Sequence, residues 1–147
     1  MQWVVEFYED FKVEFDELDT KVQDELLATA IRLEECGPLL GRPAVDTLKG
    51  SSYPNMKELR FDAADGTWRV AFAFDPRRRA ILLVAGDKSG ISQDFFYEQL
   101  IRKADKRFKH HLLDLEQEAC NENDSEGNAG KSTSRTSSKN TGKSKRA

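Results

Sequence analysis

The sequence predicts one small α/β domain of the α+β type, with its elements in the order βααβββα around a mainly antiparallel sheet. The first observation is an alternating segment followed by two segments of helical periodicity, which places two helices ahead of most of the sheet. The second is a series of alternating or fully apolar segments joined by short turns, typical of antiparallel strands. The third is a final amphipathic stripe, which predicts a C-terminal helix.

The N-terminal third indicates a strand and then two helices, which we expect on one face of the sheet. Residues 2–8 alternate between apolar and polar side chains, as in a half-buried strand. Phe11 and Phe15 begin a short helical stripe four residues apart. Asp19 is a typical N-cap for a second helix, and that helix ends at Gly37, which a proline follows.

The middle of the chain indicates a loop and then a hairpin. Residues 38–55 hold several glycines and prolines among few apolar side chains, so we expect a loop that lines a cleft, with one short extended piece at 45–48. Residues 58–62 and 68–75 alternate on either side of a turn at 63–66.

The remaining elements are a central strand, a helix and a tail. Residues 80–85 are apolar at every position, which favours a strand buried on both faces. A helix is expected from Gln93 to about His111. We therefore expect a domain over residues 1–118 and a disordered polar and basic tail over 119–147, because a segment without large apolar side chains cannot offset the entropy of ordering.

Composition limits the class of protein. The chain has 147 residues, 38% hydrophobic and 33% charged, and no apolar run of the roughly 18 residues that a membrane span needs. The N-terminus has no secretory pattern, so we expect a cytoplasmic location without a membrane partner. Cys36 and Cys120 are expected to be free thiols, because no neighbouring Cys or His has the spacing of zinc ligands.

The net charge of −3 conceals a segregation along the chain. Residues 1–41 hold 11 acidic and 3 basic side chains, whereas residues 42–111 hold 9 and 14. One surface is therefore expected to attract a polyanion, although ordinary solvated helix faces would give the same counts.

Strand alternation places specific charges on one sheet face. If Trp68 and its alternate neighbours face the helices, Arg69 points from the opposite face, and Glu58 and Arg60 on the partner strand point with it. We expect this face to be open, forming a shallow basic groove that suits a phosphodiester backbone. The simpler alternative is a surface salt bridge between Glu58 and one of the arginines.

Motifs for other chemistry are missing from the sequence. It contains no glycine-rich phosphate loop, no nucleophile elbow and no spaced pair of histidines. His110 and His111 are adjacent, so they point about 100° apart on a helix and cannot bind one metal ion together. We expect no metal site and no cofactor.

Three segments of the sheet carry a family resemblance. Residues 55–61 (NMKELRF), 66–72 (GTWRVAF) and 83–88 (LVAGDK) resemble the RelE/ParE superfamily of toxins, specifically its HigB or phage Gp49-like branch. The segments LGRP at 40–43 and DTLKG at 46–50 also resemble that branch, and the similarity covers roughly residues 2–112.

The resemblance implies a function and partners. Toxins of the RelE and HigB branches belong to type II toxin-antitoxin systems, have a RelE-like fold and cleave messenger RNA, usually on the ribosome. It implies a metal-independent endoribonuclease that inhibits translation through attack of a 2′-hydroxyl on the adjacent phosphate. The implied partners are messenger RNA, the ribosome and a cognate antitoxin, often a HigA-like helix-turn-helix protein.

The resemblance also implies site residues. Arg69 matches the family's arginine after an aromatic residue, where it holds the phosphate, and Arg60 would be a second clamp. Lys57 and Lys88 match basic positions at the edge of the site, as base, acid or phosphate ligand, and Tyr97 would stack on a base or orient the nucleophile. Strand alternation, however, puts Lys57 on the core face unless a bulge re-aims it.

Departures from the family pattern leave alternatives open. A dense lysine cluster is missing, Glu58 adds an acidic residue to the expected site, and the proton-transfer pair is unassigned. In some HigB toxins a histidine of the last helix is part of the site, so His110 and His111 remain candidates for a role in this chain. The rival functions are a ParE-like toxin that inhibits DNA gyrase without cleaving RNA, and a decayed toxin domain retained as an interaction module.

Overall fold

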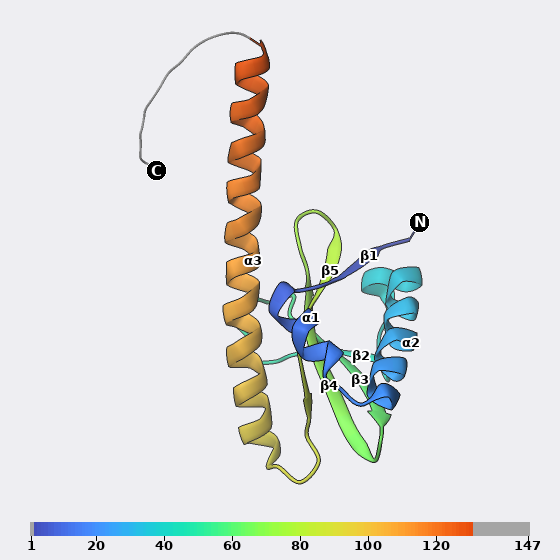
Figure 1. The fold of residues 1–147 in the computed structure, drawn as a ribbon. Coiled ribbons are helices and arrows are strands. Elements are labelled where there is room, and N and C mark those ends of the chain that lie inside the picture. Colours follow the sequence, from blue (N-terminus) through green and yellow to red (C-terminus); the bar gives the residue numbers. More distant parts are fainter. Residues whose placement is uncertain (1, 131–147) are drawn as a thin grey trace. The chain divides into compact units, whose positions relative to one another are not determined.

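The computed structural model describes residues 2–130, and Figure 1 gives its ribbon. Its elements, in chain order, are β1 (Val4–Phe7), α1 (Glu9–Asp16), α2 (Thr20–Cys36), the 3₁₀ turn η1 (Gly37–Leu39), β2 (Val45–Thr47), β3 (Lys57–Ala63), β4 (Gly66–Phe74), β5 (Arg79–Asp87) and α3 (Gln93–Gly130). The chain divides into two compact units after His111, and the first unit contains the whole sheet.

The five strands form one sheet in the order β1-β5-β4-β3-β2. Strand β1 runs parallel to β5, and every other pairing is antiparallel. The α+β class and the mainly antiparallel sheet are confirmed. The predicted order lacks one strand, because the short piece at Val45–Thr47 pairs with β3 as an edge strand. Three residues are too few for a periodic pattern to distinguish a strand from a loop.

Helices α1 and α2 lie on one face of the sheet, as expected. Both helices contribute side chains to one buried cluster with the strands. The side chains that join them to the sheet are almost completely buried: Phe11 from α1, Leu26 and Leu33 from α2, and Leu59, Val70, Phe72 and Leu82 from the strands. Burial of each side chain of this size stabilises the fold by about 1.5–3 kcal/mol, so this layer is the main core.

The first part of α3 covers the opposite face, and the prediction that this face is open is wrong. A Cβ atom on Gly86 of β5 would lie 2.8 Å from Cε1 of Phe96 in α3, so helix and strand are in close contact. Ala71 and Ala73 on the same face are 0% exposed. Small side chains let a helix approach the strands closely, and the apolar stripe of α3 gains burial there.

Helix α3 is longer than predicted. It continues to Gly130, past the expected domain boundary at residue 118, so residues 119–130 are helical where disorder was expected. Extension of an existing helix requires much less free energy than its nucleation, and residues 112–120 contain many good helix formers. The rest of the expected tail, residues 131–147, lies outside the described residues. Within the described part, no helix is both long and apolar enough to cross a membrane.

Candidate functional site

A cavity of about 440 Å³ opens between the β2–β3 edge of the sheet and the first turns of α3. We call it the β3–α3 pocket. Its walls are rich in charged side chains: it is lined by Arg42, Asp46, Thr47, Leu48, Lys49, Glu58, Arg60, Lys88, Gln93, Asp94 and Tyr97. Four cations and three carboxylates therefore share one cavity, which suits a polyanionic ligand that also needs a proton acceptor.

A buried hydrogen-bond network lies at the wall of this pocket. The Tyr97 hydroxyl donates to Oε1 of Glu58 at 2.9 Å and accepts from Nε of Arg69 at 3.3 Å. Glu58 and Arg69 are only 5% and 6% exposed, and Nη1 of Arg69 donates to the carbonyl oxygen of Trp68 at 2.8 Å. The three side chains come from β3, β4 and α3, so the site exists because α3 closes over the sheet.

Arg60 has unused hydrogen-bonding capacity. Its Nη1 lies 3.7 Å from Oδ2 of Asp46 and its Nε lies 3.9 Å from Oε2 of Glu58, both beyond hydrogen-bond distance. Among the described residues, Nε of Arg60 is a buried donor without a hydrogen-bond partner. A buried donor left unpaired costs about 1–3 kcal/mol, and an anionic oxygen would satisfy it.

The electrostatics of the network shift three pKa values. Burial raises the pKa of Glu58, and this effect outweighs the Tyr97 hydrogen bond and the nearby arginines, which lower it. Burial also raises the pKa of the Tyr97 hydroxyl. For Lys88, burial and then the charges of Arg69 and Arg60 lower the pKa of the ammonium group. Glu58 and Lys88 are thus both shifted toward neutrality, the direction that proton transfer at neutral pH requires.

The expected site residues are only partly gathered in the pocket. Arg60, Lys88 and Tyr97 line it, and the Lys88 Nζ atom lies 5.7 Å from the centre of the Tyr97 ring. Arg69 is not among the lining residues, but its Nε atom donates a hydrogen bond to the Tyr97 hydroxyl. Lys57 pairs with Phe72 across an unbroken β3–β4 register, which keeps it on the core side. The one bulge in this part of the sheet lies on the β4–β5 ladder and does not re-aim Lys57.

Sequence reasoning missed two kinds of residue. Glu58 was placed on the correct face but was interpreted as a departure from the family pattern, and its burial depends on α3. Arg42 and Lys49 also line the pocket, from the loop on either side of β2. Their positions follow from the loop conformation, which has no periodicity, although the glycine- and proline-rich composition did indicate a cleft.

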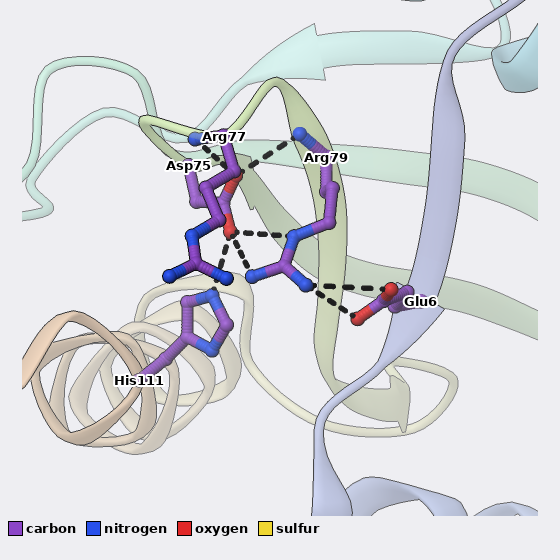
Figure 2. Close-up of polar contacts among 5 residues, drawn as sticks. All are labelled: Glu6, Asp75, Arg77, Arg79 and His111. Atoms are coloured by element: carbon purple, nitrogen blue, oxygen red, sulfur yellow. Dashed lines mark hydrogen bonds and ion pairs between the residues drawn. The ribbon is translucent and has the colours of Figure 1, made fainter. Parts of the chain in front are cut away.

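His111 lies elsewhere, at the turn between β4 and β5 (Figure 2). Its Nε2 atom is 2.8 Å from Oδ2 of Asp75, whose side chain is fully buried and also accepts from the guanidinium group of Arg79. Asp75 is six residues along the chain from Arg69, about 20 Å in a strand. His111 therefore belongs to a structural contact and is separate from the β3–α3 pocket.

A second cavity, also of about 440 Å³, lies beside α3. Basic side chains dominate its lining, which consists of Tyr8, Asp10, Gln99, Arg102, Lys103, Lys106, Arg107 and His110. Arg107 is already paired with Glu14, Nη2 to Oε2 at 2.6 Å. Within residues 2–130, no group of three or more His, Cys, Asp or Glu side chains could hold a metal ion. Of these two cavities, the β3–α3 pocket has the more complete set of groups for chemistry, because it combines cations with a buried carboxylate, whereas Asp10 in the second cavity is exposed.

Comparison with known proteins identifies related sequences. The chain is 44% identical over 100 residues to the candidate toxin HigB2 of Mycobacterium tuberculosis, which covers 67% of this chain and 49% of that protein. It is 49% identical over 80 residues to the candidate toxin HigB3 of the same organism, which covers 54% of this chain and 68% of that protein. The chain therefore matches about half the length of HigB2 and about two thirds of HigB3.

The fold has a solved counterpart. A doubly substituted variant of the Escherichia coli toxin RelE, in the free state, superposes with a TM-score of 0.55 at 16% identity, over 73% of this chain and 98% of that one. The similarity confirms the RelE-like fold that the strand motifs indicate. The family of phage-derived Gp49-like proteins matches residues 13–109. With this match and the two HigB relatives, the chain belongs to the Gp49-like family.

Proposed function

We propose that this chain is the toxin of a type II toxin-antitoxin system, and that it inhibits translation by cleaving messenger RNA on the ribosome. The observation that carries the proposal is the β3–α3 pocket, where four cations surround a buried network of Glu58, Tyr97 and Arg69. Cations of this kind hold RNA phosphates. The RelE-like fold and the similarity to candidate HigB toxins support the toxin role.

The proposed reaction uses the RNA's own nucleophile. A 2′-hydroxyl attacks the adjacent phosphorus, the O2′–P bond forms, and the P–O5′ bond breaks, which leaves a cyclic phosphate and a 5′-hydroxyl end. Arg60 holds the phosphate, because its Nε donor is unpaired among the described residues. Lys88 adds positive charge at the same pocket, and both groups stabilise the negative charge of the transition state without a metal ion.

Arg69 and Tyr97 have different roles in this scheme. Arg69 does not line the pocket, so it acts as a positioning residue that fixes the Tyr97 hydroxyl. Tyr97 lines the pocket and orients Glu58 through its 2.9 Å hydrogen bond. Lys57 has no role in the pocket, since it faces the core side of the sheet.

The proposed partners are messenger RNA, the ribosome and a cognate antitoxin of the HigA-like helix-turn-helix type. The antitoxin is tested by co-expression of the full chain, carrying an affinity tag, with the product of the adjacent gene. A stable stoichiometric complex that restores growth is expected. An adjacent product that neither binds nor protects would contradict the pairing.

The nuclease activity is tested by brief induction of the full chain in a bacterial host, with growth and primer-extension mapping of transcripts. New ends inside translated frames are expected for the wild type, and Arg60→Ala should reduce them about 100-fold or more. Arg102→Ala is the matched control, because its side chain is 69% exposed and lines the other cavity, so it should cleave like the wild type.

The same experiment separates the rival functions. Growth arrest without new transcript ends would overturn the nuclease and direct attention to gyrase, the target of the ParE branch. Neither arrest nor cleavage would overturn the toxin role and favour a decayed domain that acts as an interaction module.

A further inference from the structure

The remaining step of the proposed reaction is removal of the proton from the attacking 2′-hydroxyl. A general base must line the pocket, be able to accept a proton near neutral pH and lie beside the group that holds the phosphate. Arginine is excluded because it stays protonated in proteins. The titratable pocket-lining side chains that remain are Lys49, Lys88, Tyr97 and three carboxylates, Asp46, Glu58 and Asp94.

Tyr97 and Asp46 fit the requirement poorly. The Tyr97 hydroxyl already donates its proton to Glu58, and its raised pKa keeps that proton in place at neutral pH. Asp46 has a side chain 39% exposed, Oδ2 lies between Arg42 and Arg60, and Oδ1 accepts from the main-chain N–H of Thr47. The oxygens of Asp46 are thus already engaged, and Lys49 and Asp94 are exposed to solvent.

Glu58 meets all three conditions. Its Oε1 atom accepts the Tyr97 hydrogen bond, which fixes the carboxylate, whereas Oε2 makes no hydrogen bond within the described residues. Oε2 lies 3.9 Å from Nε of Arg60, the buried donor that awaits an anionic partner. A phosphate held by Arg60 would therefore place the adjacent 2′-hydroxyl next to Oε2 of Glu58.

We propose that Glu58 is the general base of the cleavage reaction and that Lys88 is the general acid, an assignment that rests on the proposed nuclease function. Lys88 lines the same pocket, with its Nζ atom 5.7 Å from the centre of the Tyr97 ring. Oε2 of Glu58 accepts the 2′-hydroxyl proton as the O2′–P bond forms. The P–O5′ bond breaks, and the leaving 5′ oxygen takes a proton from the Lys88 ammonium group. Glu58 then releases its proton to water and Lys88 takes one up, which restores the starting state.

The assignment predicts a pH dependence with a definite sign. The charged and titratable groups around Glu58 come from every neighbouring element: Tyr97 of α3, Arg69 of β4, Arg60 of β3, Asp46 of β2 and Lys88 beyond β5. Their net effect with burial is a raised pKa for Glu58 and a lowered one for Lys88. The rate should rise with pH as Glu58 loses its proton and fall again as Lys88 loses its own.

The test is single-turnover cleavage of a defined message on programmed ribosomes by the purified full chain, between about pH 5 and 9. Glu58→Gln retains an oxygen for the Tyr97 hydrogen bond but cannot accept the proton, so the rate should fall about 10²–10⁴-fold and lose its rising acid limb. Glu58→Asp retains a carboxylate and should keep that limb at a reduced rate. Asp62→Asn is the control, since Asp62 is an exposed carboxylate on the same strand and outside the pocket.

Binding and folding readouts separate a base from a structural anchor. The Glu58→Gln protein should bind ribosomes carrying a message with a 2′-deoxy nucleotide at the cleavage site as the wild type does, within about threefold, and should melt normally by circular dichroism. An unchanged acid limb in Glu58→Gln, or a loss of binding that accounts for the lost rate, would overturn the assignment. If the wild type itself leaves the all-ribose message intact, the nuclease proposal fails. That outcome is distinct from failure of the Glu58 assignment, because it is seen without any variant.

Discussion

Asp75 offers the sharpest prediction about stability. This carboxylate lies at the turn between β4 and β5 with its side chain fully buried (Figure 2). Its Oδ1 atom accepts the main-chain N–H groups of Arg77 and Arg79, each at 3.0 Å. Its Oδ2 atom accepts from Nε and Nη2 of Arg79, at 3.1 and 3.0 Å, and lies 2.8 Å from Nε2 of His111. One side chain therefore joins the turn, the following strand and α3.

Replacement of Asp75 by alanine removes all of these acceptors. Loss of one partner of a buried ion pair costs about 3–5 kcal/mol, because the other charge remains without compensation. Arg79 is 20% exposed and retains Glu6 at 3.4 Å, so water and Glu6 reduce the penalty. We therefore expect Asp75→Ala to lower the free energy of unfolding by about 3 kcal/mol. Asp75→Asn keeps an oxygen for the two main-chain N–H groups and should lower it by about half as much.

The assay is urea denaturation of the full chain at pH 7, followed by far-ultraviolet circular dichroism. Asp62→Ala is the matched control: it removes an exposed carboxylate from β3 and should change the free energy of unfolding by no more than about 0.5 kcal/mol. A loss below about 1 kcal/mol in Asp75→Ala would refute the reasoning, since it would mean that the buried network contributes no more than a surface ion pair.

The same network predicts acid sensitivity. Burial acts to raise the pKa of Asp75, but hydrogen bonds from His111 and Arg79 outweigh it, so the pKa lies below its usual value. A carboxylate with a depressed pKa contributes stability that is present above its unfolded value, about 3.9, and is lost as pH falls through the folded value. Wild-type stability should therefore fall below about pH 4 more steeply than that of Asp75→Asn.

Two further changes probe the contact between α3 and the sheet. Arg107→Ala removes paired hydrogen bonds to Glu14, at 2.6 and 3.0 Å, and one to the carbonyl oxygen of Leu83 at 2.7 Å. Urea denaturation should show that the free energy of unfolding falls by about 2–3 kcal/mol. Glu14→Gln leaves the bond to Leu83 in place, so an equally small loss in both variants would contradict the prediction. Gly86→Ala places a Cβ atom 2.8 Å from the ring of Phe96, so thermal melting should show destabilisation of about 1–3 kcal/mol, and an unchanged melting temperature would refute the close approach.

Strand alternation predicted the geometry of the sheet face well. The parity of β3 and β4 assigned Glu58, Arg60 and Arg69 to one side, and the observed register places Arg60 directly opposite Arg69. The same parity placed Lys57 on the core side, where it lies opposite Phe72. A period of two residues fixes these relations within a hairpin, so they follow from local sequence alone.

The location of α3 did not follow from local sequence. An apolar stripe indicates that one side of a helix is buried, but it does not indicate which face of the sheet the helix packs against. The small residues Ala71, Ala73 and Gly86 were the available signal, because a face of small side chains admits a helix at close range. This face was instead expected to be an open groove.

The consequence of that covering helix is chemical. On an open face, Glu58 and the two arginines would form a solvated ion pair worth about 0–1 kcal/mol, and water would keep the pKa of the carboxyl near its usual value. Under α3, Glu58 is 5% exposed, its pKa is raised, and Tyr97 of α3 supplies the hydroxyl that orients it. Electrostatic interactions are stronger where water is excluded. The helix that sequence periodicity did not place is thus the element that turns a row of surface charges into a set of groups able to transfer protons.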